Sequence, residues 1–158
     1  MTNDLTLYDL LKQLFSKDEL AGTSGVVVIQ DGDGYVLFNE YHLIQEGNRY
    51  KLTKFNTHLD NKFYSLRNAV IWATLDKRQR VTDSLQVLNL DRMLEGTTAN
   101  FALHKHLLDT TKNVENKGLY FTKLQEDKIK KKSILKQLNS YAQEVKKWQF
   151  QQLAAATK

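Results

Sequence analysis

The stretch LYFTKLQEDKIKKKSILKQLNSYAQEVKKWQFQQL, residues 119–153, decides most of the fold. It contains no glycine and no proline, so nothing in it obliges a helix to stop. Its apolar residues recur at intervals that place their side chains on one face of a helix. We therefore predict an amphipathic helix here. The residues expected on its apolar face are Leu124, Leu135, Leu138, Ala142 and Val145, flanked by Ile134, Tyr141 and Trp148.

A single helix over residues 119–153 would be longer than a compact molecule of this size. It would extend roughly 50 Å at 1.5 Å per residue, whereas a compact chain of this length is about 40 Å across. Three arrangements would resolve the mismatch. The helix bends back near Asp127–Ser133, it pairs with residues 82–113 as an elongated hairpin, or another chain covers its apolar face.

The preceding segment, from Thr82 onward, also has a helical pattern. We expect Gly96 to end a first helix as a C-cap and Thr97 or Thr98 to begin a second one. Residues 113–118 form a polar connection to the last helix. The apolar positions of the two expected helices are Leu85, Leu88, Met93 and Leu94 in the first, and Phe101, Leu103, Leu107 and Leu108 in the second.

The N-terminal half changes from helix to strand patterns. Residues 4–15 have helical spacing, and residues 26–29 form a β-branched run followed by the turn signal Asp-Gly-Asp-Gly at 31–34. A second turn falls at 46–48, and residues 50–55 alternate between polar and apolar. We predict a three-stranded antiparallel meander with a bulge near residues 39–40, or four shorter strands.

A further helix is expected to cover this sheet. After a polar loop over residues 56–62, Ser65 is a good N-cap, and Leu66, Ala69, Val70 and Ala73 follow with helical spacing. A meander alone cannot bury its apolar face, so this helix supplies the cover. The predicted fold is therefore α+β. It has a sheet-plus-helix module at 1–80 and a helical hairpin at 81–158, which form either two domains or one continuous domain.

Composition excludes several classes of protein. The 158 residues are 41% hydrophobic and 26% charged, a mixture typical of one globular domain. The absence of cysteine excludes disulfides, thiolate zinc sites, iron–sulfur clusters and cysteine nucleophiles. The apolar runs are too short to cross a bilayer, and the first residues lack the basic region of a secretory signal. We expect no membrane contact.

The net charge of +5 is concentrated near the C-terminus. Residues 123–147 hold eight lysines against three acidic residues, an excess of five that equals the charge of the whole chain. Two acidic residues precede lysines by four positions and pair with them on a helix. The stripe left over is Lys128, Lys132 and Lys136, a candidate anionic contact. Because it includes no arginine and no interleaved aromatic ring, a solvated helix face is the favoured interpretation.

No motif predicts catalysis or a bound cofactor. The 31–34 turn lacks the later oxygen ligands of a calcium loop, and Gly22–Gly25 lacks the lysine of a phosphate-binding loop. His104 and His106 are two residues apart, so they point to different sides of a helix, and no cysteine or carboxylate cluster completes a metal site. We expect a protein that is not an enzyme, with no catalytic, cofactor, metal or small-molecule site.

The apolar face of the last helix is the strongest candidate for function. If the sheet module does not cover it fully, it contacts another protein or a second copy. The candidate partner-contact residues are Leu135, Leu138, Tyr141, Val145, Trp148 and Phe150.

Three segments also carry a resemblance. Residues 16–18 together with 21–27, Phe63–Trp72 and Lys123–Lys128 resemble small uncharacterised proteins of marine tailed bacteriophages, including phages of cyanobacteria. The resemblance covers most of the chain, includes no motif for chemistry and transfers no functional residue. It implies a viral origin, with a location in the virion or the host cytoplasm.

Together these observations predict a non-enzymatic phage structural or assembly protein that acts by helix-mediated protein contact. The alternative is a nucleic-acid-associated or host-protein-binding regulatory protein that uses the basic C-terminal helix.

Overall fold

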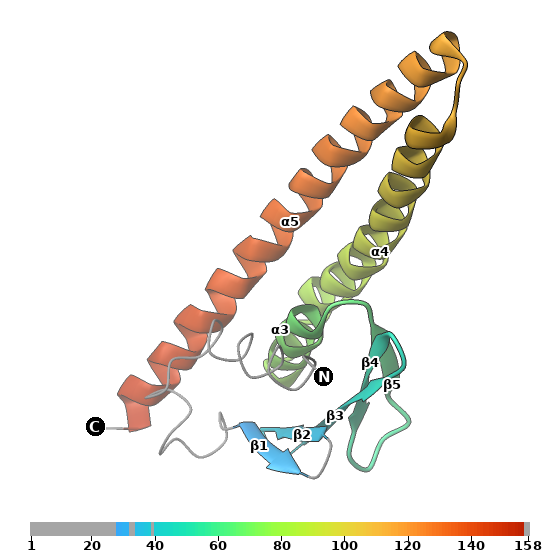
Figure 1. Cartoon of the computed structure of the whole chain (residues 1–158). Helices are drawn as coiled ribbons and strands as arrows, with labels where there is room; N and C mark the ends of the chain where they lie inside the picture. Colours follow the sequence, from blue (N-terminus) through green and yellow to red (C-terminus); the bar gives the residue numbers. More distant parts are fainter. Residues whose placement is uncertain (1–27, 32–33, 39, 157–158) are drawn as a thin grey trace.

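The computed structural model describes residues 28–31, 34–38 and 40–156. The helix expected at 4–15, the loop at 22–25 and the start of the first expected strand lie outside these ranges. The described residues form an antiparallel sheet, one short helix and two long helices (Figure 1). The α+β class predicted from the sequence is confirmed.

The sheet is a meander in which every strand pairs with its neighbour in sequence. Gly47 has φ +63° between the third and fourth strands, so the turn predicted at 46–48 is present. Gly34 permits a close approach, because an added Cβ there would lie 2.5 Å from Cγ2 of Ile44 on the paired strand. The strands are β1 (Val28–Asp31), β2 (Gly34–Leu37), β3 (Tyr41–Glu46), β4 (Arg49–Lys54) and β5 (Asp60–Phe63).

The number of strands exceeds both alternatives offered by the sequence. The chain turns back after Leu37, where Phe38 has φ +56° and Glu40 N donates to Leu37 O at 3.0 Å, so β2 and β3 pair with each other instead of forming one bulged strand. The alternative of shorter strands therefore matches β1 to β4. The fifth strand, β5, lies mostly in the stretch that was expected to be a loop. The sequence did not predict it, because only Phe63 in this strand is buried and its residues do not alternate between polar and apolar.

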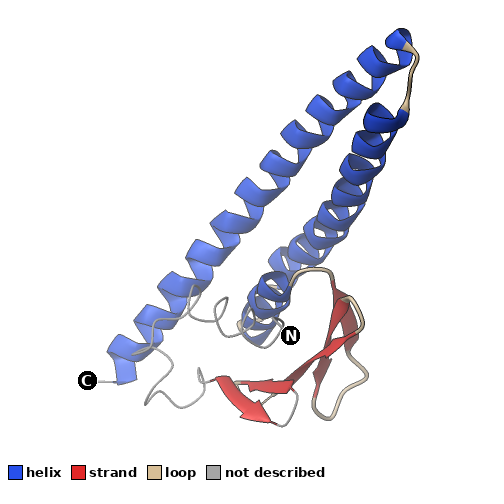
Figure 2. Ribbon diagram, in the orientation of Figure 1, coloured by secondary structure: helices blue, strands red, loops and turns tan. Residues whose placement is uncertain are grey.

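Helix α3 (Leu66–Lys77) covers the sheet, as predicted. Ser65 is its N-cap, and the Ser65 side chain accepts a hydrogen bond from Asn68 N at 3.4 Å. In Figure 2, α3 crosses above the strands on the side where the long helices lie. Phe63 from the sheet and Trp72 from α3 pack with ring centroids 6.0 Å apart, and both are buried.

Helices α4 (Val81–Thr110) and α5 (Val114–Ala156) form the elongated antiparallel hairpin that was one of the three predicted arrangements (Figure 1). Helix α5 is continuous through residues 127–133, so it does not bend back. Its 43 residues extend about 65 Å. None of the described helices is sufficiently long and apolar to span a bilayer.

Two expected boundaries in the hairpin are wrong. Gly96 does not end a helix, and Thr97 and Thr98 do not begin one, because all three lie inside α4. A glycine in a helix interior costs only about 1 kcal/mol, and the buried neighbours Leu94 and Thr97 hold the helix together there. The connection between α4 and α5 is also shorter than the expected 113–118, because α5 already begins at Val114. Asn113 precedes α5, and its Oδ1 accepts from the backbone N of Glu115 at 2.9 Å and of Asn116 at 3.2 Å.

One buried cluster joins the sheet, α3 and the lower part of the hairpin. Leu37, Leu43 and Leu52 from the sheet belong to it together with Ile71 and Leu75 from α3. The hairpin contributes Val87, Leu90 and Leu94 from α4, and Ile134, Leu138, Ala142 and Val145 from α5. The rest of the hairpin, residues 95–133, lies beyond the last of these core residues and is called the distal hairpin below.

Candidate interaction surface on the hairpin

The structure buries two of the six predicted partner-contact residues inside the protein. Leu138 and Val145 are 2% and 0% exposed and belong to the core, so they are not available to a partner. This corrects their proposed role. The sequence shows that α5 has an apolar face, but α4 and the sheet module cover its lower part.

Two aromatic candidates also pack against other residues of the same chain, which leaves less of their surface for a partner. Tyr141 and Trp148 pack against the core cluster. The Trp148 ring contacts the Phe38 ring edge-to-face with centroids 6.3 Å apart, and the Arg78 guanidinium carbon lies 5.4 Å from the indole centroid. Phe150 lies in the last part of α5, where the structure describes the backbone only.

Leu135 is the predicted contact residue that remains open, with 38% exposure. It lines a hollow of about 550 Å³ between the two long helices. All three lysines of the predicted anionic stripe line the same hollow, so the structure brings together residues that the sequence assigned to two separate surfaces. The residues around the hollow are Phe101, Lys128, Lys131, Lys132, Leu135, Lys136 and Asn139.

This hollow has an apolar floor and a basic rim. Phe101 from α4 and Leu135 from α5 are its two large apolar residues, and the other residues are four lysines and one asparagine. No acidic residue is among those that line it. Lysine ammonium groups repel one another in this arrangement, and an anion placed between them would relieve the repulsion.

The sequence did not assign Phe101 or Lys131 to this surface. Lys131 was expected to pair with Asp127, four residues earlier on the same helix. In the structure Asp127 instead contacts α4, with 2.6 Å between its Oδ2 and Nδ1 of His104. The position of Lys131, three residues from Lys128 and four from Leu135, was a detectable signal. Phe101 could be found only after α4 and α5 were known to pair.

The His104–Asp127 contact holds the distal hairpin together. The two side chains are 18% and 12% exposed, so solvent screens their interaction only in part. Leu124 is also buried in this region. These contacts keep α4 and α5 side by side where the sheet no longer supports them, and so maintain the walls of the hollow.

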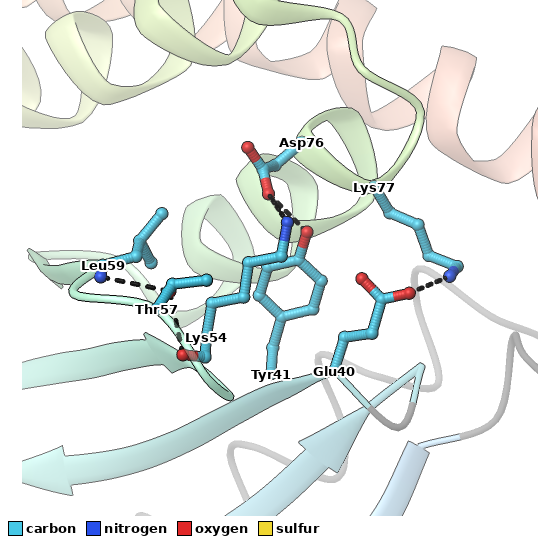
Figure 3. A network of polar contacts seen from close by, with 7 residues as sticks. All are labelled: Glu40, Tyr41, Lys54, Thr57, Leu59, Asp76 and Lys77. Atoms are coloured by element: carbon cyan, nitrogen blue, oxygen red, sulfur yellow. Dashed lines mark hydrogen bonds and ion pairs between the residues drawn. The ribbon is translucent and has the colours of Figure 1, made fainter.

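A second polar cluster fixes α3 on the sheet (Figure 3). The Tyr41 hydroxyl on β3 donates to Asp76 on α3, and Lys54 Nζ on β4 lies 3.3 Å from the same carboxylate. Burial raises the pKa of Tyr41, and the neighbouring Asp76 carboxylate raises it further. Lys77 Nζ lies 2.6 Å from Glu40 Oε1 beside it. Every one of these groups is satisfied within the protein, so the cluster is a structural connection.

Asp91 connects the hairpin to this module. Its carboxylate on α4 accepts hydrogen bonds from Tyr64 N at 2.9 Å, Ser65 N at 3.0 Å and Asn68 Nδ2 at 2.9 Å. Asp91 is buried, and this burial raises its pKa even though the three donors act in the opposite direction. These three hydrogen bonds hold the middle of α4 against the junction between β5 and α3.

Large apolar side chains also project into solvent from the distal hairpin. Phe121 is 55% exposed and Ile129 is 70% exposed. Within the described residues, no group of three or more His, Cys, Asp or Glu is arranged to hold a metal ion. The exposed apolar residues of the distal hairpin are Leu103, Val114, Leu119, Phe121 and Ile129.

None of the protein-family models, curated proteins or solved structures compared with this chain matches it. Its function is therefore inferred from the hairpin itself.

Proposed function

We propose that this protein is a non-enzymatic structural or assembly protein whose distal hairpin contacts another protein. The observation that carries the proposal is the exposure of large apolar side chains, such as Phe121 and Ile129, on a rod that projects beyond the sheet (Figure 1). Single exposed apolar residues are ordinary, but several on one projecting element are typical of an interaction site.

The energetic argument supports contact over simple exposure. Fully burying one Leu, Ile or Phe side chain stabilises a complex by about 1.5–3 kcal/mol. Phe121 and Ile129 are eight residues apart on α5 and lie on neighbouring parts of its surface, so burial of both by one partner would offset part of the cost of association. Aromatic residues such as Phe121 are also enriched at the centres of interfaces.

The resemblance to tailed-phage proteins leads us to propose the virion as the place of assembly. The test is mass spectrometry of purified particles of a phage that encodes this chain, combined with a lysine-reactive crosslinker. We expect the chain in the particles, with crosslinks from Lys117 and Lys123 of the distal hairpin to a second virion protein. Lys62 on β5 is the control and should give fewer intermolecular crosslinks. Absence from the particles would exclude a virion component.

The second candidate is a nucleic-acid-associated or host-protein-binding regulatory protein. The gathering of Lys128, Lys132 and Lys136 around one hollow is the observation that favours it. Three phosphate contacts predict a slope of roughly −2 to −3 for log affinity against log salt concentration. Binding of single- or double-stranded DNA measured by fluorescence anisotropy tests this, and no binding at low salt would reject the nucleic-acid form.

A further inference from the structure

The hollow between α4 and α5 suggests the chemistry of the partner. We infer that it is a docking groove for an acidic amphipathic helix of another protein; this inference rests on the proposed function, which it makes more specific. Phe101 and Leu135 form an apolar floor, and Lys128, Lys132 and Lys136 stand around it.

The dimensions of the groove suit a helix. Along α5 its lining runs from Lys128 to Asn139, which corresponds to about 16 Å or three helical turns. Its volume of about 550 Å³ is comparable to that of ligand pockets. A helix lying along α5 would place apolar side chains from successive turns on Leu135 and Phe101, while Glu or Asp residues beside them would reach the lysines.

Another large apolar side chain lies beyond the hollow, towards the tip of the hairpin. Phe121 lies seven residues before Lys128 and fourteen before Leu135, so all three are on the same side of α5. Phe121 is exposed. A partner helix longer than three turns would therefore find a second apolar anchor beyond the hollow.

The charges argue against a second copy of this chain in the groove. A symmetric dimer would bring the same surface of both molecules together and oppose one set of lysines to the other. A partner with carboxylates would instead form ion pairs with Lys128, Lys131, Lys132 and Lys136, none of which has an ion-pair partner within 4.0 Å among the described residues.

Two other classes of ligand fit less well. Sites for single-stranded nucleic acid combine cations with aromatic rings on which bases stack, whereas Phe101, the only aromatic residue lining this hollow, is half-buried in its floor. Helices that bind membranes present a convex apolar face to the lipid. Here the apolar residues lie in a concavity between two helices.

The test uses the full-length protein and a fluorescein-labelled synthetic peptide. The peptide is an amphipathic helix of about 18 residues with leucines on one face and glutamates flanking them. One control peptide replaces each glutamate by glutamine, and another keeps the composition but scrambles the leucine spacing. Binding is measured by fluorescence anisotropy at low and at physiological salt.

Two pairs of variants locate the binding site. Leu135→Glu places a carboxylate in the floor, and Leu85→Glu makes the same change at an exposed α4 position outside the hollow and outside the distal hairpin. Replacing Lys128, Lys132 and Lys136 by glutamine removes the rim. The matched control replaces Lys62, Lys112 and Lys130 by glutamine and removes the same charge elsewhere.

We expect the glutamate peptide to bind at least tenfold more tightly than either control peptide. The two groove variants should weaken its binding at least tenfold, while the two control variants change it less than twofold. Equal losses in both lysine variants would show unspecific charge attraction and overturn the proposal. So would no peptide binding, or tighter binding of oligonucleotides or anionic vesicles that depends on the same lysines.

Failure of this inference can be distinguished from failure of the proposed function. If the peptide does not bind but Lys117 and Lys123 crosslink to another virion protein, the hairpin makes contact through its tip and only the groove assignment falls. If neither result is obtained, the proposed function falls as well.

Discussion

At the scale of single residues, Asp91 is the most deeply buried charged group on the described part of the hairpin. It receives three hydrogen bonds from the residues around the start of α3 and is almost completely buried. A buried carboxylate is tolerated only when donors surround it. Because these donors come from the junction of β5 and α3, Asp91 determines how the hairpin stands on the sheet module.

The raised pKa of Asp91 predicts a specific dependence of stability on pH. Burial raises the pKa of Asp91 in the folded state above the ordinary 3.8 that applies in the unfolded state. Between the unfolded-state pKa and the higher folded-state pKa, the folded protein therefore binds more protons than the unfolded protein. The contribution of Asp91 to the free energy of unfolding therefore falls as pH rises through that window. Urea unfolding at successive pH values should show this fall in the native protein relative to Asp91→Asn. A difference that grows with pH would mean that the hydrogen bonds outweigh burial.

At the scale of elements, the hairpin is the part where local sequence signals and structure disagree most clearly. Gly96 is followed by two threonines, a pattern typical of one helix ending and another beginning, yet α4 continues through it. An added Cβ at Gly96 would meet no atom within 4 Å. The residue is therefore a glycine in an ordinary helical site and is not required by the backbone.

Gly96→Ala should raise the free energy of unfolding by about 0.5–1 kcal/mol, because alanine loses less backbone entropy on folding. Thermal and urea unfolding measure the change. Gly47→Ala is the matched control and should be destabilising, since Gly47 has φ +63° in the turn between β3 and β4. A destabilised Gly96→Ala protein would indicate that the helix ends where the sequence suggested.

The His104–Asp127 pair is one of the contacts that join the two helices of the distal hairpin. His104→Ala leaves the mostly buried Asp127 carboxylate without this partner and should cost about 1–3 kcal/mol of local stability. Hydrogen exchange should become faster in residues 100–127 and stay unchanged in α3. His106→Ala changes an exposed histidine two residues away and should leave both regions unaffected. Uniform exchange in the His104 variant would show that the pair does not support the hairpin.

At the scale of the whole molecule, α5 divides into a part that the fold uses and a part that it leaves open. Ile134 is 2% exposed and belongs to the core, whereas Ile129 is 70% exposed. The two isoleucines are five residues apart on one helix and face opposite environments. The first is enclosed within the core cluster, whereas the second is mostly open to solvent.

This division predicts different effects of equivalent substitutions. Ile134→Ala should lower the free energy of unfolding by about 2–5 kcal/mol through the cavity it creates. Ile129→Ala should change it by less than about 0.5 kcal/mol, because the side chain is already in water. Urea unfolding compares them directly, and circular dichroism checks that both variants keep their helices. Equal losses would show that Ile129 is buried in solution, which would also remove it from the proposed contact surface.

Local sequence patterns were sufficient to predict the class of each main element. Local periodicity is a property of neighbouring residues, so it was enough to predict the helical hairpin, the antiparallel meander and the helix that starts after Ser65. It was also enough to find the lysine stripe of α5. It was not enough for β5, whose single buried residue leaves no pattern, or for the continuous path of α4 through Gly96.

Which surfaces remain open depends on the packing of distant elements and could not be predicted from local patterns. Leu138 and Leu135 belong to the same apolar pattern, yet Leu138 is buried in the core cluster and Leu135 lines the hollow. Likewise Asp127 turned to His104 on the opposite helix and left Lys131 facing the groove. The physical reason is that burial depends on which distant element lies against a face, and that choice is made by the packing of the whole chain.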